Sequence, residues 1–140
     1  TDTRNFGAII RTAAATKTST IVVSTNNSAP INDDVVKTSA GGVFKIPISK
    51  VDNLKDAIYL LKSNNIDVIA LTEKAEDLIY SYKLNKPVSI ILGSEDKGIS
   101  KGILKIVDKK AKIPMKNTDD SLNVSVACGV TLFEIIRQRQ

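Results

Sequence analysis

The stretch SIILG, residues 89–93, shows no alternation between apolar and polar side chains. A strand with one face in water alternates, whereas a parallel strand covered on both faces is continuously apolar. The stretch lies in an expected strand at residues 88–93, and four further short runs, at residues 20–24, 43–49, 67–72 and 110–115, are also expected to form strands. The stretch and its counterparts therefore predict a parallel sheet enclosed by helices.

Helix-like stretches separate the expected strands, and they cover residues 6–16, 51–65, 99–107 and 123–140. In the second of these, Asp52 or Asn53 can cap the N-terminus and Asn64-Asn65 can end the helix. Strands that alternate with helices predict an α/β fold, with a mainly parallel sheet and helices on both faces. The chain has no internal repeat and no linker, so residues 1–140 are expected to form one domain.

The composition limits the chemistry that this chain can perform. It contains no His and a single Cys, Cys128. No transition-metal site is therefore expected, and the commonest general base is missing. A lone Cys cannot form an intrachain disulfide, which fits a reducing cytoplasm. No apolar run approaches the roughly 18 residues of a membrane span, so a membrane partner is not expected. The net charge of +5 favours an anionic partner without establishing one.

A first polar segment is TRNFGAIIRTA, residues 3–13. Asn5 is placed to cap the following helix, Gly7 permits close approach, and Arg11 lies in an apolar segment where it needs an anion or an acceptor. A cap and an arginine that reaches from a core helix to water would explain the same residues. Because this segment begins so near Thr1, which is not Met, we expect an upstream part of the protein to be missing.

A second polar segment is ILGSEDKGIS, residues 91–100, where the apolar strand runs into Gly93, Glu95 and Gly98 before a helix. Glycines there let backbone amides reach the edge of a ligand, and a helix N-terminus offers unpaired N–H groups. The segment is neither a GxGxxG fingerprint nor a Walker loop, which argues against a dinucleotide-binding oxidoreductase. An ordinary strand-to-helix turn is the alternative.

A third polar segment is IPMKNTDDSLNVS, residues 113–125, in which Ser121, Asn123 and Ser125 alternate at the entrance of the last helix. A helix cap explains one of these residues but not three of them. Apolar walls with a few placed polar groups are typical of a small-molecule pocket. The apolar residues that would line it are Ile113, Met115 and Leu122.

Together, and in this order, these segments resemble the three motifs of the SpoU (TrmH) family of RNA ribose 2′-O-methyltransferases, in the SPOUT superfamily. The matching pieces are NFGAIIRTA (5–13), ILGSEDKGIS (91–100) and IPMKNTDDSLNVSVACGVTLFEIIRQ (113–138), and KTSAGGVFKIPI (37–48) also fits. The resemblance implies S-adenosyl-L-methionine as cofactor, a homodimer, and methylation of a ribose 2′-hydroxyl in tRNA or rRNA, with a guanosine as the expected target. It also implies a deep trefoil knot near the C-terminus, which nothing else would suggest because knots are nearly absent from proteins.

The resemblance also implies roles for particular residues. The expected catalytic residues are Arg11 and Asn5 of the first motif, Glu95 of the second, and Ser121 and Asn123 of the third. The expected cofactor-binding residues are Leu92, Gly93, Gly98, Ile113, Met115 and Leu122, which would hold the cofactor largely through backbone groups around adenine. A non-catalytic RNA-binding relative of the same fold is the alternative, and the intact catalytic set argues against it.

Two positions depart from the family pattern, because many members have glycine where this chain has Asp96 and Asn117. Asn tolerates a left-handed backbone better than most residues, so Asn117 is compatible with the pattern. Asp96 adds negative charge beside the expected pocket. This substitution bears on the detailed cofactor contacts and not on the class of enzyme.

Basic residues follow the second motif, and Lys97, Lys101 and Lys105 share one helix face at four-residue spacing. The face is either a solvated surface or a track for RNA phosphates. Aromatic residues make up only 4% of the chain, so we expect little base stacking. Target choice is therefore expected to lie in upstream residues.

The C-terminal helix has two apolar stripes, one of Val124, Ala127, Cys128, Leu132, Ile135 and Ile136 and another of Val126, Val130 and Phe133. A helix that is apolar nearly all round needs burial on two sides. One side would pack on the domain and the other on a second subunit, so we expect a homodimer formed through this helix. A helix fully enclosed within a monomer is the alternative. In either case Cys128 is expected to be a core residue and not a nucleophile.

Overall fold

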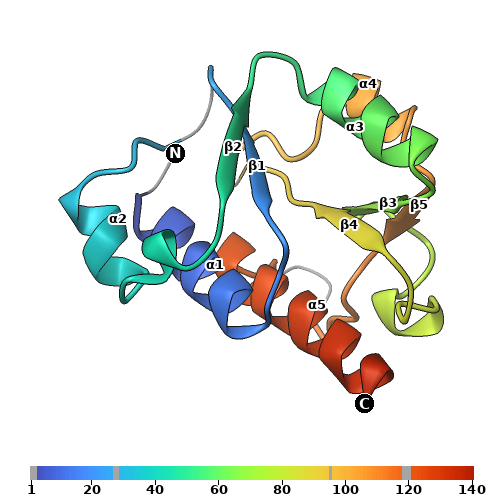
Figure 1. Ribbon diagram of the computed structural model, residues 1–140. Coiled ribbons are helices and arrows are strands. Elements are labelled where there is room, and N and C mark those ends of the chain that lie inside the picture. The colour runs from blue at the N-terminus through green and yellow to red at the C-terminus, as the bar shows by residue number, and fades with distance from the viewer. Residues whose placement is uncertain (1–2, 27–28, 95, 118–120) are drawn as a thin grey trace.

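The computed structural model is an α/β fold, and it describes residues 3–26, 29–94, 96–117 and 121–140 (Figure 1). The strands are β1 (Ile21–Ser24), β2 (Ile48–Val51), β3 (Asp67–Leu71), β4 (Val88–Ile91) and β5 (Lys109–Ala111). Every pairing between these strands is parallel. The predicted α/β class with parallel strands is confirmed.

The single sheet that the sequence predicts is divided into two parallel sheets. β1 pairs with β2, and β3 lies between β4 and β5. In the second sheet Ala70 is opposite Ile91, and Leu71 is opposite Ala111. Among the described residues β4 pairs only with β3, so β4 is an edge strand and its residues are half-buried instead of fully covered. The continuous apolar run therefore predicted more burial than this strand has.

The helices are α1 (Thr3–Ala15), α2 (Asp33–Thr38), α3 (Leu54–Ser63), α4 (Lys101–Leu104) and α5 (Val124–Arg139), with 3₁₀ turns η1 (Gly42–Phe44) and η2 (Ile79–Ser81). Figure 1 shows α1 and α5 on one side of the strands and α3 and α4 on the other. Helices on both faces are therefore confirmed. Among the described residues, no helix has both the length and the hydrophobicity that a membrane span requires.

The ends of the elements agree with the sequence only in part. Asn53 caps α3, its side chain accepting a hydrogen bond from the Lys55 N–H at 3.0 Å, as predicted. Asn5 lies inside the first turn of α1 and is not its cap, because the helix already begins at Thr3. The helix expected over residues 99–107 is reduced to α4.

The strand expected over residues 43–49 is wrong in its first half. Ala40 and Gly41 have left-handed backbones, with φ of +52° and +80°. The chain then closes the turn η1, in which the Lys45 N–H donates to the Gly42 carbonyl at 2.9 Å. A backbone that turns in this way cannot stay extended, so β2 begins only at Ile48.

Two apolar clusters form the core, and α5 joins them. One contains Ile10, Ala13, Val35 and Ile46, and the other contains Ile69, Ile79, Leu84, Ala111 and Ile135. Leu132 of α5 packs against both clusters. The two sheets are therefore held together by packing on shared helices and not by a continuous hydrogen-bond ladder.

The C-terminal half of α5 is fixed by polar contacts. Gln138 accepts a hydrogen bond from the Leu84 N–H at 2.7 Å and donates to the Tyr82 carbonyl at 3.0 Å. Glu134 is buried, and its carboxylate accepts from Gln138 and from the Arg137 guanidinium. The hydrogen bond from Arg137 lowers the pKa of Glu134 below its usual value, with a smaller contribution from Gln138. The orientation of α5, and therefore of its N-terminus, is fixed by these bonds.

Candidate functional site

The loop that follows β4 is a tight turn closed on itself. The Gly98 N–H donates to the Ser94 carbonyl at 2.9 Å, and the Lys97 N–H donates to the Ser94 hydroxyl at 3.3 Å. Gly98 has a φ of +66°, a left-handed conformation that favours glycine, and open space where a Cβ would lie. At Gly98 the turn therefore presents backbone without a side chain. Glu95, an expected catalytic residue, lies outside the described residues.

Gly93 and Leu92 begin this turn, and both are half-buried. A Cβ on Gly93 would lie 2.6 Å from the carbonyl carbon of Gly98, which is closer than real Cβ contacts come. The glycine thus allows the two arms of the turn to touch. Close packing within the chain therefore explains why residue 93 is a glycine. From the sequence, only contact with a ligand had been expected there.

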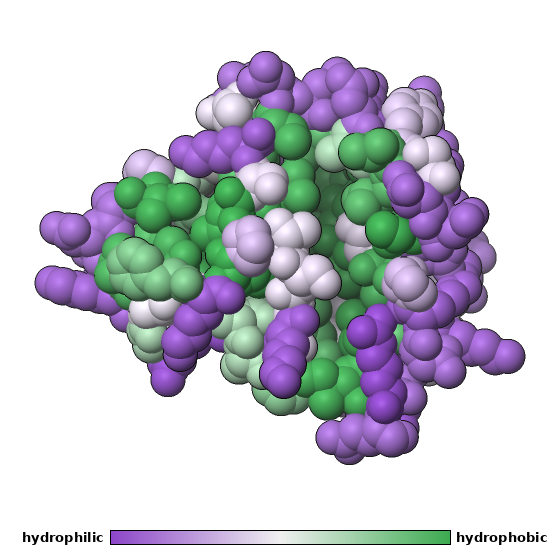
Figure 2. Space-filling model, in the orientation of Figure 1, coloured by the Kyte–Doolittle hydropathy of each residue, from purple (hydrophilic) through white to green (hydrophobic). Residues whose placement is uncertain are grey.

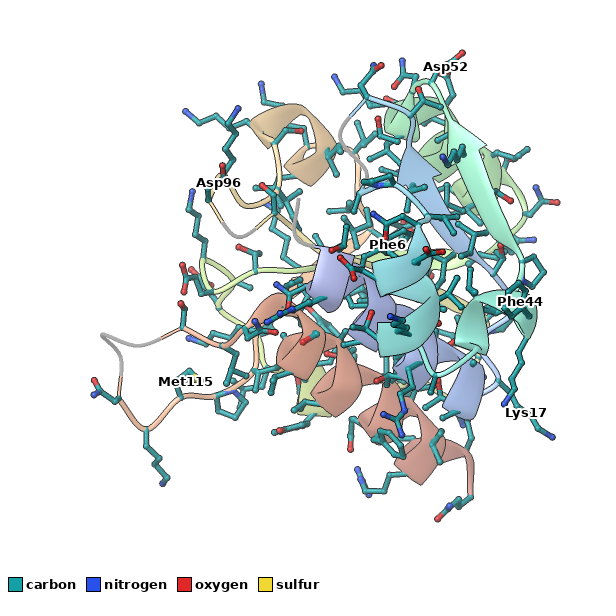
Figure 3. The ribbon with its side chains drawn as sticks, turned by 90° about the vertical axis from the view of Figure 1, so that its left-hand side faces the viewer. Phe6, Lys17, Phe44, Asp52, Asp96 and Met115 are labelled. Atoms are coloured by element: carbon teal, nitrogen blue, oxygen red, sulfur yellow. The ribbon has the colours of Figure 1, made fainter. Side chains whose placement is uncertain are left out.

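The segment that follows β5 leaves the sheet at the same edge as the β4 loop. β3 pairs in parallel with both strands, so their carboxyl ends point the same way on either side of it. Ile113 packs on the apolar cluster around Ile69, and Met115 is half-buried. Asp96 and Met115 project on the same side of the molecule in Figure 3. The second and third motifs are therefore brought to one edge of the sheet, where ligands of α/β folds commonly bind.

Asn123 is the N-cap of α5 and accepts a hydrogen bond from the Ser125 N–H at 2.9 Å. The Ser125 hydroxyl also donates to the Asn123 side chain, and the Ala127 N–H donates to the Asn123 carbonyl. Two of the three alternating polar residues are thus explained by the start of the helix. Ser121 and Leu122 are exposed just before it. Leu122 is 37% exposed, which is unusual for a large apolar side chain and leaves it accessible to a ligand.

Arg11 occupies a different place in the fold. It is exposed on α1, beside a hollow formed by that helix and by the segment from Ser39 to Lys45. No described residue of the second or third motif lines this hollow. Asn5 is half-buried in the first turn of the same helix. Within one chain, therefore, the structure does not place Arg11 in a described cavity with Gly93, Ile113 or Leu122.

Lys45 also lines the hollow, together with Arg11, and it was not among the site residues expected from the sequence. Lys45 belongs to the segment 37–48 that resembles the family, but nothing in the sequence places it beside Arg11. Cys128, in contrast, is buried, and burial raises the pKa of its thiol to about 11. A thiol with that pKa is protonated at neutral pH, which supports a core role for Cys128.

Comparisons with known proteins agree with one another. Residues 1–133 match the SpoU rRNA Methylase family. The 23S rRNA (guanosine-2'-O-)-methyltransferase RlmB of Xanthomonas campestris pv. campestris is 41% identical over 138 residues, which cover 99% of this chain and 55% of the relative. The RlmB of Yersinia pestis is 34% identical over 139 residues, covering 99% of this chain and 56% of the relative. The chain thus spans about half the length of these relatives.

Solved structures show the same likeness. The A. aeolicus TrmH/SpoU tRNA modifying enzyme superposes with a TM-score of 0.88 at 31% identity, covering 99% of this chain and 71% of that one. An AdoMet-bound rRNA methyltransferase from Sinorhizobium meliloti gives a TM-score of 0.89 at 31% identity, covering 97% and 52%. The SpoU methyltransferase AviRb from Streptomyces viridochromogenes, in complex with AdoMet, gives 0.92 at 24% identity, covering 99% and 57%, which supports the fold alone.

Proposed function

The chain belongs to the SpoU rRNA methylase family, and on this premise we propose that it transfers a methyl group from S-adenosyl-L-methionine to a ribose 2′-hydroxyl of structured RNA. The relatives named above make the guanosine of an rRNA the favoured target, with tRNA as the other candidate. The observation that carries the proposal is the convergence of the second and third motifs at one edge of the β4–β3–β5 sheet. Residues 1–140 would form the catalytic domain.

The residues at this edge fit the proposed cofactor. The apolar side chains of Leu92, Ile113, Met115 and Leu122 are half-buried or exposed, and we propose that they surround the turn that exposes backbone at Gly98. An adenine ring needs apolar contact on its faces and hydrogen bonds at its edge, and such a combination supplies both. When bound, the cofactor supplies a methyl group that its sulfonium has already activated.

Arg11 is proposed to position the RNA and not to remove a proton. A guanidinium stays charged in ordinary protein sites, which makes it a poor general base. A charged, planar guanidinium is well suited to clamp a phosphate with two hydrogen bonds. We propose that Arg11 holds a backbone phosphate beside the target ribose, and that this phosphate shares in accepting the 2′-hydroxyl proton.

The polar residues of the third motif are proposed to act near the methyl group. Asn123 fixes the first turn of α5 through Ser125 and so positions Ser121 and Leu122 just ahead of the helix. Asn5 would support Arg11 from the first turn of α1, and Glu95 would act from the loop after β4.

A homodimer is proposed to complete the site. Val126 and Phe133 of α5 are 50% and 56% exposed, although both are apolar and lie seven residues apart on one helix face. Arg11 lies apart from the other motifs within one chain, and α1, which carries it, packs against α5. Pairing of two copies through α5 would bring Arg11 of the partner subunit toward the loops after β4 and β5.

The trefoil knot of the family is also proposed for this chain, near its C-terminus. The support is the superposition on TrmH/SpoU structures over 97–99% of the chain at 31% identity. Such a knot would place the segment before α5 against the loop after β4, which is the arrangement that the cofactor site requires.

The proposal is tested by calorimetric titration with S-adenosyl-L-methionine and by transfer of tritiated methyl to RNA from a deletion strain. We expect binding and transfer by the wild type. Arg11→Ala should reduce transfer at least about a hundredfold with nearly unchanged cofactor affinity. A protein that binds RNA but not the cofactor would instead be the non-catalytic relative. Arg11→Lys with most activity retained would contradict the bidentate clamp, since lysine lacks the planar fork.

A further inference from the structure

The hollow beside α1 is bordered by two cations and contains no described carboxylate in its lining. Its floor consists of small residues, namely Ala14, Ala15, Ala40 and Gly42, and its rim carries Arg11 and Lys45. A floor without side-chain bulk and a rim with two positive charges are suited to a small, compact anion. The size and charge of a phosphate group meet this description.

The two cations have no acceptor within the described part of the chain, where neither makes a hydrogen bond or an ion pair. Elsewhere in the same molecule Lys86 and Lys109 both contact Asp67, at 2.7 Å and 2.9 Å. The buried Ser39 hydroxyl in the hollow already donates to the Val36 carbonyl at 3.1 Å. The donors that remain in the hollow are therefore those of Arg11 and Lys45.

Backbone packing holds Lys45 close to Arg11. A Cβ on Gly42 would lie 3.3 Å from the Ile10 carbonyl oxygen and 3.4 Å from the Arg11 Cα, so the segment is pressed directly onto α1. Ala40, two residues before Gly42, has a φ of +52°, a left-handed conformation that is strained for a non-glycine residue. Strain of this kind persists where the surrounding structure imposes it. The hollow is thus a built feature of the fold.

Phe44 lies between Gly42 and Lys45 in the chain and is 80% exposed, the most exposed of the large apolar side chains described. Single exposed apolar residues are common and need no explanation by themselves. Phe44, however, directly precedes Lys45 in the chain, and Lys17 lies on the same side of the molecule as Phe44 (Figure 3). Aromatic side chains beside cations are the usual surface for an unstacked nucleotide, whose base stacks while its phosphate is neutralised.

We propose that Arg11 and Lys45 together seat one backbone phosphate of the RNA, and that Phe44 stacks on the base next to that phosphate. The inference rests on the proposed function and adds two substrate-positioning residues, Lys45 and Phe44, that the motifs do not include. It also departs from the expectation that base stacking is minor, because one aromatic residue is placed where stacking would fix the register of the RNA.

The test measures binding of a fluorescein-labelled, single-stranded 12-nucleotide RNA by fluorescence anisotropy at several salt concentrations. Lys45→Ala should make the slope of log affinity against log salt less steep by about 0.7, which corresponds to about fivefold weaker RNA binding at 0.1 M salt. Phe44→Ala should lower the affinity by about tenfold and leave the slope unchanged, while Phe44→Trp should retain binding. Lys74→Ala and Tyr59→Ala are the matched controls, since they remove an exposed lysine and an exposed aromatic residue that do not line the hollow.

Cofactor titration distinguishes failure of this inference from failure of the proposed function. Both variants should bind S-adenosyl-L-methionine as the wild type does, and both should raise the KM for RNA in the methyl-transfer assay. If Lys45→Ala and Phe44→Ala bind RNA as tightly as the two controls while methyl transfer persists, the inference is overturned and the proposed function stands. It is equally overturned if Phe44→Ala changes only the self-association of the protein.

Discussion

At Gly93 the chain leaves no space for a side chain. A Cβ there would lie 2.6 Å from the carbonyl carbon of Gly98 and 2.8 Å from the backbone nitrogen of Ile99. Both neighbours are backbone atoms, which cannot turn away as the end of a flexible side chain can. From the sequence, Gly93 was expected to let a ligand approach the backbone. In the structure, Gly93 also lets the two arms of the loop pack against each other.

Gly93→Ala is expected to displace the loop after β4 and to lower the affinity for S-adenosyl-L-methionine at least about tenfold, the typical cost of an overpacked contact. Calorimetric titration and thermal unfolding measure the effect. Gly102→Ala is the matched control, because a Cβ there would meet only the end of the Lys55 side chain, 2.7 Å from its Nζ. Alanine in α4 should even favour the helix by up to about 1 kcal/mol. Equal cofactor affinity in the two variants would show that the contact at Gly93 is unimportant.

Single residues were predictable where their role depends on near neighbours in the chain. The Asn53 cap is confirmed, and Asn123 is the one of the three alternating polar residues that caps α5. Each of the two side chains accepts a hydrogen bond from a backbone N–H two residues further along. Lys45 could not be assigned in this way, because its position beside Arg11 depends on packing between segments far apart in the sequence. The same limit applies to the exposure of Phe44, which no local pattern indicates.

Among the elements, the longer helices and two of the strands were predictable, whereas the shortest helices and the turns were not. Helices α3 and α5 and strands β1 and β3 lie close to their expected ranges. The helix α2 was overlooked because its six residues complete less than two turns, although Asn32 followed by Asp33 and Asp34 is a cap signal. Residues 43–49 were wrongly expected to form a strand throughout. The turn at Ala40 and Gly41 leads into η1 and prevents an extended backbone in the first half of this segment.

Asp67 links the three strands of the larger sheet. Its carboxylate at the start of β3 contacts Lys86, which precedes β4, and Lys109 of β5. Hydrogen bonding to Lys86, and then to Lys109, lowers the pKa of Asp67 below its ordinary value of 3.8. A carboxyl with a lowered folded-state pKa stabilises the fold above its unfolded pKa, and this stabilisation is lost as the pH falls through the folded pKa.

Asp67→Asn should therefore destabilise the protein at neutral pH and reduce the loss of stability on acidification from about pH 5 to pH 2. Urea unfolding at a series of pH values gives the free energy of unfolding for both proteins. Glu73→Gln removes an exposed carboxyl outside this network and serves as the control. Parallel curves for Asp67→Asn and wild type over this pH range would contradict the linkage.

At the scale of the molecule, the class of fold followed from the sequence but the assembly of its parts did not. The division into two sheets depends on which strand edges meet, and local periodicity contains no such information. Figure 2 shows apolar side chains gathered in a hollowed region of the face that it views, with hydrophilic side chains around them. The separation of Arg11 from the other two motifs is likewise a property of tertiary packing, in which α1 crosses α5 near Thr12 and Gly129.

The exposed face of α5 leads to the prediction for the whole assembly. Cys128, Thr131 and Ile135 are buried on one side of this helix, while Val126 and Phe133 remain exposed on another. Burial of each such side chain in a symmetric interface contributes about 1.5–3 kcal/mol. We therefore expect a dimer, and we expect Val126→Asp combined with Phe133→Asp to raise its dissociation constant at least about a hundredfold.

Sedimentation velocity over a range of protein concentrations measures this change, and circular dichroism checks that the variant is folded. Leu60→Asp introduces the same charge on α3 at a leucine that is 65% exposed, and it should leave the dimer intact. If Arg11 of the partner subunit completes each site, the monomeric variant should lose methyl transfer while it stays folded. A folded variant that sediments as the wild type does would place the subunit interface elsewhere. A monomeric variant with full activity would instead show that one chain assembles the site alone, and Arg11 would then have to reach the loops after β4 and β5 within its own subunit.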